Sequence, residues 1–124
     1  MSSLTLSPLP KTWLFDVDGT LVVHNGHLRP QGDELLPGVK EVFAQIPPED
    51  SVILLTARQD IYRVKLETFL HANGIRYNHI LYNMPMGERI LVNDKKPSGL
   101  MTAHAVNKDR NAPLDLTITI DQSL

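Results

Sequence analysis

The feature that most constrains the fold is a regular alternation of short apolar runs with helical patterns. Residues 51–56 read SVILLT, an apolar run typical of a strand buried on both faces of a parallel sheet. Residues 12–16 read TWLFD and lead into the turn signal Asp18-Gly19. Strands that alternate with helices imply βαβ units. The sequence therefore predicts an α/β fold, a three-layer α/β/α sandwich over a mostly parallel, Rossmann-like sheet.

Two helices are expected between these strands. Residues 39–46 repeat apolar side chains at the i, i+3, i+4 and i+7 spacing of one helix face, after Gly38 and before Pro47-Pro48. A second helix is expected from Asp60, as its N-cap, to the C-cap pair Asn73-Gly74. Further strand candidates are residues 77–82, 89–93, 101–106 and 116–120. The alternation in the last of these places three apolar side chains on one face, where they would seal the core or a subunit interface.

One segment departs from the alternation. Residues 21–29 read LVVHNGHLR, and Asn25-Gly26 between short apolar arms is a strong hairpin signal. We therefore expect a small β-hairpin directly after the first strand and its acidic turn. His24 and His27 stand on opposite sides of that turn, so a metal site made by this pair is not expected.

Size and charge narrow the class of protein. The 124 residues fit one domain, residues 1–124, and a net charge of −2 gives no general attraction to nucleic acid or to an anionic membrane. The basic stretch 95–110 lacks interleaved aromatic residues and is interpreted as a solvated face. No apolar run is long enough to span a membrane, and no targeting segment is evident, which favours a cytoplasmic location. With no cysteine, a reactive site must use carboxylates, histidines, hydroxyls or amines.

The acidic turn 16–20, DVDGT, is the most informative stretch for function. Asp16 and Asp18 lie two residues apart at the expected carboxyl end of the first buried strand, where ligands bind in open α/β folds. Two neighbouring carboxylates repel each other unless a cation or a shared proton compensates them. Oxygen ligands of this kind suit Mg²⁺, which takes few protein carboxylates and keeps positions for water and phosphate oxygens.

The motifs DVDGT, LLTAR and a run ending in VND, in that order, resemble the haloacid dehalogenase (HAD) superfamily of phosphohydrolases. The resemblance covers residues 12 to about 99, and the expected hairpin stands where that family has its flap. The stretches HNG, LLPGVKE, ILLTAR and ERILVNDKKPSG are more similar to small bacterial HAD-type phosphatases, often associated with sugar-phosphate or capsule pathways. The resemblance implies a Mg²⁺-dependent phosphomonoester hydrolase with a small phosphorylated substrate.

The resemblance implies a role for each residue of the first two motifs. Asp16 would be the nucleophile that forms an aspartyl-phosphate, and Asp18 would be the general acid and then the base. Gly19 and Thr20 would shape the turn around the substrate phosphate. The hydroxyl of Thr56 would hold a phosphate oxygen.

The neighbouring Arg58 has two open interpretations. It would clamp a substrate anion, or it would be a solvated residue at a helix start. His24, on the flap, would touch the substrate.

The third motif departs from the family pattern. Asp94 would complete the Mg²⁺ site with Asp16 and Asp18, although Asn93 stands where a second acid is common. The lysine that neutralises the phosphate in many relatives is missing, since Met84 precedes the relevant proline. Lys96 is the favoured replacement, with Lys95 and Arg89 as the alternatives.

The short chain also bears on the substrate and on rival functions. No insertion is long enough to fold as a cap, so the flap, a neighbouring subunit in a homo-oligomer or the substrate itself would have to cover the site. One alternative is a catalytically impaired HAD-like binding or regulatory module. The other is a phosphoaccepting receiver-like domain, which is disfavoured because residues 51–56 end in threonine and not in an accepting aspartate.

Overall fold

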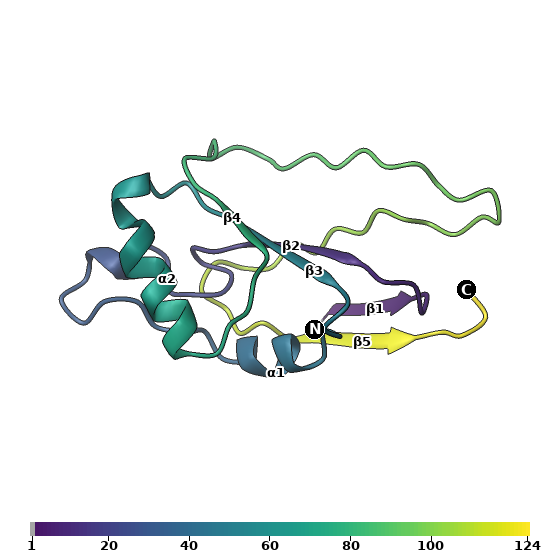
Figure 1. Ribbon diagram of the computed structural model, residues 1–124, viewed down its shortest axis with the longest axis horizontal. Helices are drawn as coiled ribbons and strands as arrows, with labels where there is room; N and C mark the ends of the chain where they lie inside the picture. Colours follow the sequence, from purple (N-terminus) through teal and green to yellow (C-terminus); the bar gives the residue numbers. More distant parts are fainter. Residues whose placement is uncertain (1) are drawn as a thin grey trace.

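The computed structural model of the protein describes residues 2–124, which form a small α/β structure (Figure 1). The elements, in chain order, are β1 (Ser2–Leu6), β2 (Thr12–Asp16), η1 (Gly26–Leu28), α1 (Val39–Ala44), β3 (Ser51–Leu55), η2 (Asp60–Tyr62), α2 (Arg63–Ala72), β4 (His79–Leu81) and β5 (Leu116–Ile120). Over these described residues, no helix has the length and apolar character needed to cross a membrane.

The strands of residues 2–124 form two separate parallel sheets. The larger has the order β2-β3-β4, and the smaller pairs β1 with β5. The predicted parallel arrangement of the runs at 12–16, 51–56 and 77–82 is therefore confirmed, with β3 and β4 shorter than expected. The pairing of β5 with the chain start was not predicted, because β1 has only two leucines to mark it.

The larger sheet is well covered on one face only. Register partners share a face, so Phe15 lies beside Leu54, and both are buried. On the opposite face Leu14 is 47% exposed and Leu81 is 44% exposed. The residues of β3 on this face are only half-buried, so the expectation that 51–56 is buried on both faces is wrong for the second face. The protein is an α/β structure with parallel sheets, and the expected three-layer arrangement is not confirmed.

The two predicted helices are present with small changes. α1 ends at Ala44, just before Pro47-Pro48, and α2 ends at Ala72 with Asn73 as its C-cap and Gly74 at a φ of +69°. The C-cap pair is thus confirmed. The prediction of Asp60 as N-cap is wrong, because this residue begins the short η2 turn and its carboxylate forms an ion pair with Arg63.

The segment between β4 and β5 differs most from the prediction. Residues 84–107, all of them described, contain no helix or strand and run as a long excursion away from the sheets (Figure 1). The strands expected at 89–93 and 101–106 are therefore wrong. Ile90 and Val92 are 86% and 89% exposed. An apolar run favours a strand, but a strand forms only where a neighbouring edge supplies hydrogen bonds.

The expected hairpin at 21–29 is also wrong in its turn. Val22 bridges Leu35, so the returning arm lies beyond residue 29. The backbone N–H of Val23 donates to the Glu34 carbonyl at 3.0 Å. Asn25, at a φ of +55°, precedes the η1 turn and does not form a two-residue hairpin turn. The result is a wider loop, residues 24–33, which we call the flap loop.

Candidate active site

The carboxyl ends of the parallel strands bring the predicted residues to one edge. The backbone N–H of Val17 donates to the Leu55 carbonyl at 3.0 Å, and that of Thr56 donates to the Leu81 carbonyl at 3.0 Å. The residues that follow β2 and β3 therefore lie side by side, as the sequence predicted for Asp16 and Thr56.

The acidic turn is a tight, self-bonded loop. Gly19 has a φ of +84°, which an L-residue adopts only with strain, and its N–H donates to the Val22 carbonyl at 2.7 Å. The Thr20 hydroxyl donates to Asp16 Oδ2 at 2.9 Å. Gly19 and Thr20 thus shape the turn as predicted. The Asp16 carboxylate remains 37% exposed, so a ligand can reach it.

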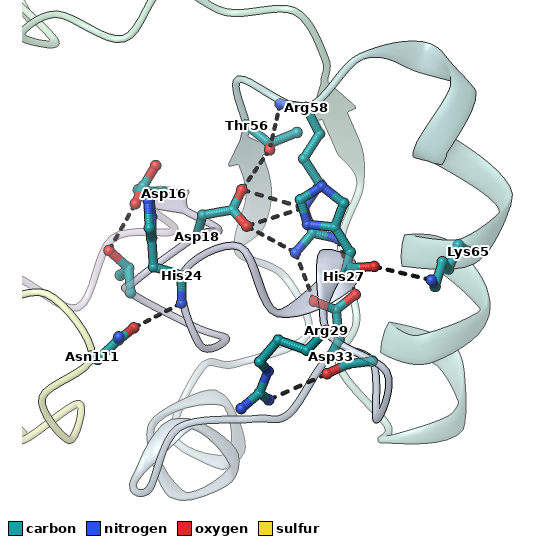
Figure 2. A network of polar contacts seen from close by, with 12 residues as sticks. Asp16, Asp18, His24, His27, Arg29, Asp33, Thr56, Arg58, Lys65 and Asn111 are labelled. Atoms are coloured by element: carbon teal, nitrogen blue, oxygen red, sulfur yellow. Dashed lines mark hydrogen bonds and ion pairs between the residues drawn. The ribbon is translucent and has the colours of Figure 1, made fainter.

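Asp18 is held on the inner side of the same turn, as Figure 2 shows. Its Oδ2 accepts a hydrogen bond from the Thr56 hydroxyl at 2.9 Å, and its Oδ1 accepts from Arg58 Nη2 at 2.8 Å and Nε at 3.0 Å. The Thr56 hydroxyl also accepts the Arg58 backbone N–H at 3.0 Å. Thr56 is fully buried, so in this structure its hydroxyl orients Asp18 and does not face a ligand.

Arg58 has neither of the two predicted roles, a clamp for a substrate anion or a solvated residue at a helix start. Its side chain is 2% exposed, so it is not solvated, and the acids that it clamps belong to the protein. On the side away from Asp18, Nη1 and Nη2 donate to the two oxygens of Asp33 at 2.9 and 2.7 Å. Burial disfavours the charged guanidinium, but the hydrogen bonds to Asp33 and Asp18 outweigh burial and raise the pKa of Arg58.

Two cations approach Asp16 from residues beyond β4. Arg89 Nη1 lies 3.3 Å from Asp16 Oδ1, and Lys108 Nζ donates to the Gly19 carbonyl at 2.9 Å. Burial lowers the pKa of Lys108, and the charges of Asp109 and Asp16 oppose that effect. Arg89 was one of the sequence alternatives, whereas Lys108 was assigned to a solvated face. The sequence carries no local signal for Lys108, because the return of the excursion to the turn places it there.

The favoured lysine and the third predicted metal ligand stand elsewhere. Lys96, Lys95 and Asp94 are exposed on the excursion, where the Lys96 N–H donates to the Leu100 carbonyl at 3.0 Å. The Thr102 hydroxyl donates to the Asp94 carbonyl. Within residues 2–124, the structure brings none of these three side chains into a hydrogen bond or ion pair with the acidic turn.

The flap loop borders the acidic turn at His24, whereas its other histidine, His27, packs on the body of the protein. The His24 N–H donates to Asn111 Oδ1 at 2.7 Å, and a Cβ at Gly19 would lie 3.8 Å from His24 Cβ. His24 is therefore beside the acidic turn, as predicted. His27 is buried against Tyr62, and burial, aided by the charge of Arg58, lowers the pKa of its imidazole. Asp33 and Asn111 were missed, because each acts through a contact distant in sequence.

The donor set for Mg²⁺ is partly suitable. The Asp16 carboxylate is partly exposed. Among the described residues, its Oδ1 contacts only Arg89, through a long and exposed ion pair of 3.3 Å. Both oxygens of Asp18 are engaged by Arg58 and Thr56. Among residues 2–124 no group of three or more histidine and carboxylate side chains is arranged to hold a metal. A cation held by Asp16 and by the oxygens of a phosphate fits, because Mg²⁺ commonly uses one or two carboxylates.

Comparisons with known proteins return no similar protein. A scan against protein-family models, a search of curated proteins and a search of solved structures each find no match to this chain. The functional conclusion therefore depends on the chemistry of the acidic turn and on the motif resemblance.

Proposed function

We propose that the protein is a Mg²⁺-dependent phosphomonoester hydrolase of the HAD type, acting through an aspartyl-phosphate. The observation that supports this proposal best is the exposed Asp16 carboxylate, flanked by Arg89 and Lys108, with Asp18 held two residues away. An accessible carboxylate with cations beside it suits attack on a dianionic phosphate, since the cations offset the repulsion between the two anions.

The proposed reaction uses these groups in turn. Asp16 attacks phosphorus, and the bond to the leaving oxygen breaks. Lys108 and Arg89 neutralise charge on the phosphoryl oxygens, which is the main protein contribution to phosphoryl transfer. Asp18 donates a proton to the leaving oxygen and then accepts one from the water that hydrolyses the aspartyl-phosphate. Mg²⁺, held by Asp16 and the phosphate, would supply further charge neutralisation.

The remaining parts of the proposal concern fold, substrate and location. A HAD-type three-layer sandwich would require cover over the exposed sheet face around Leu14 and Leu81. The proposed substrate is a small phosphorylated metabolite such as a sugar phosphate, which would reach Asp16 past the flap loop without a cap domain. A cytoplasmic location and a homo-oligomer stay predictions from the sequence.

Metal removal tests the proposal directly. The purified protein with Mg²⁺ should hydrolyse p-nitrophenyl phosphate or a member of a sugar-phosphate panel, and EDTA should abolish turnover. Added Mg²⁺ in excess of EDTA should restore the rate, because charge neutralisation contributes several kcal/mol to this reaction class. Activity that EDTA leaves unchanged would contradict the metal assignment. A folded protein without turnover on any ester would favour the binding or regulatory module instead.

A pair of lysine variants tests which cation serves the phosphate. Lys108→Met removes the charge beside Gly19 and should lower kcat/KM by roughly 100-fold, the usual effect of losing one group that stabilises developing charge. Lys96→Met alters an exposed lysine on the excursion and should change kcat/KM by less than about 2-fold. Steady-state kinetics on one ester decides between them. A large loss of kcat/KM in Lys96→Met, with none in Lys108→Met, would instead support Lys96, the lysine favoured from the sequence.

A further inference from the structure

Asp33, Arg58 and Asp18 form a buried row of alternating charges (Figure 2). The Arg58 guanidinium lies between the two carboxylates, and its Nη2 donates to Asp33 Oδ1 at 2.7 Å and to Asp18 Oδ1 at 2.8 Å. The side chains of Arg58 and Asp33 are 2% exposed, and that of Asp18 is 15% exposed. Asp18, which belongs to the acidic turn, is thus the most accessible member of the row. Within the described contacts, Asp33 is linked to Asp18 only through Arg58.

The flap loop holds Asp33 in this position. Lys65, on α2, donates from Nζ to the His27 carbonyl at 3.1 Å, and the His27 ring packs edge-on against Tyr62 at 4.5 Å. Arg29 Nη2 donates to the Gly32 carbonyl at 3.2 Å, one residue before Asp33. These contacts hold the flap loop to the body of the protein at His27 and close its turn just before Asp33.

The row fixes the orientation of the Asp18 carboxylate. Arg58 holds Asp18 Oδ1 with Nε and Nη2, while Nη1 and Nη2 of the same planar guanidinium are held by the two oxygens of Asp33. Without the Asp33 carboxylate, the guanidinium would lose both hydrogen bonds on its outer side. Arg58, and the Asp18 carboxylate bound to it, would then no longer be held in one orientation.

We infer that Asp33 is a positioning residue which acts through Arg58 and holds the Asp18 carboxyl group in the orientation from which it reaches the leaving oxygen. The inference rests on the proposed hydrolase function. As the bond from Asp16 Oδ to phosphorus forms and the bond from phosphorus to the leaving oxygen breaks, that oxygen takes the proton of Asp18. The role concerns the step in which the leaving group departs.

Two esters with different leaving groups test the inference. An alkyl phosphate requires a proton on its departing oxygen, whereas p-nitrophenolate is a stable anion and requires little. Asp33→Asn should lower kcat for the alkyl ester by roughly 100-fold, within the range of acid catalysis, and kcat for p-nitrophenyl phosphate by less than about 3-fold. Glu34→Gln is the matched control, since Glu34 adjoins Asp33 but is 68% exposed, and both of its rates should stay unchanged.

Arg58→Lys is the second variant, because it retains the charge but cannot span both carboxylates with one planar fork. It should show the same leaving-group dependence, and the double variant should lose no more than either single variant. If Asp33→Asn melts far below the wild type, Arg58→Lys is measured instead, at a temperature where that variant is folded. Equal losses on both esters, or no loss on either, in a folded variant of an active enzyme would overturn the inference. Inactivity of the wild type on both esters would instead count against the proposed function.

Discussion

Asp16→Asn is expected to abolish phosphate-ester hydrolysis while leaving the fold intact. An amide oxygen is a very poor nucleophile toward phosphorus, so no phospho-enzyme should form and kcat should fall by at least about 1,000-fold. The fold should persist because the Thr20 hydroxyl can still donate to the amide oxygen, and the ion pair with Arg89 is long and exposed. Steady-state kinetics measures the loss of kcat. Mass spectrometry of the acid-quenched enzyme detects the phospho-enzyme, which should form in the wild type only.

Asp115→Asn provides the matched control for this change. Asp115 is exposed just before β5, and its side chain is not among the described contacts of the acidic turn, so the same chemical substitution should leave kcat within about 2-fold of wild type. Circular dichroism and thermal melting verify that both variants are folded. Full activity in a folded Asp16→Asn protein would exclude the aspartyl-phosphate route.

Gly38→Ala is expected to cause a large loss of stability although it adds a single methyl group. Gly38 has a φ of +87°, and a Cβ at this position would overlap the Leu114 carbonyl oxygen. The backbone contributes about 1–2 kcal/mol of strain for an L-residue at such a φ, and relieving the overlap requires the segment before β5 to shift away from α1. We expect the free energy of unfolding to fall by roughly 4 kcal/mol, a large part of the stability of a small domain.

Gly32→Ala separates backbone strain from steric overlap. Gly32 has a φ of +78°, but a Cβ there would meet no atom within 4 Å. Its alanine variant should lose about 1–2 kcal/mol, the strain component alone. Urea unfolding with unchanged m-values measures both losses. Equal stability of the two variants would show that Gly38 has no close contact with the segment before β5.

The core of the fold could be predicted because its strands and helices follow local patterns of apolar residues. The apolar runs at 12–16 and 51–56 became β2 and β3, and the helical spacing at 39–46 became α1. The excursion could not be predicted from such patterns. Residues 89–93 have the apolar character of a strand, yet whether an apolar run pairs depends on a neighbouring edge that no local pattern describes.

The sequence by itself determined the acidic turn: two aspartates, a glycine that tolerates positive φ and a threonine that bonds Asp16, all within five residues. The tertiary structure alone decided their partners. It placed Lys108 beside Gly19, paired the guanidinium of Arg58 with both Asp18 and Asp33, and left Lys96 exposed on the excursion. Turn geometry depends on residues a few positions apart, whereas charges pair across tens of residues, so only the folded chain shows which ones meet.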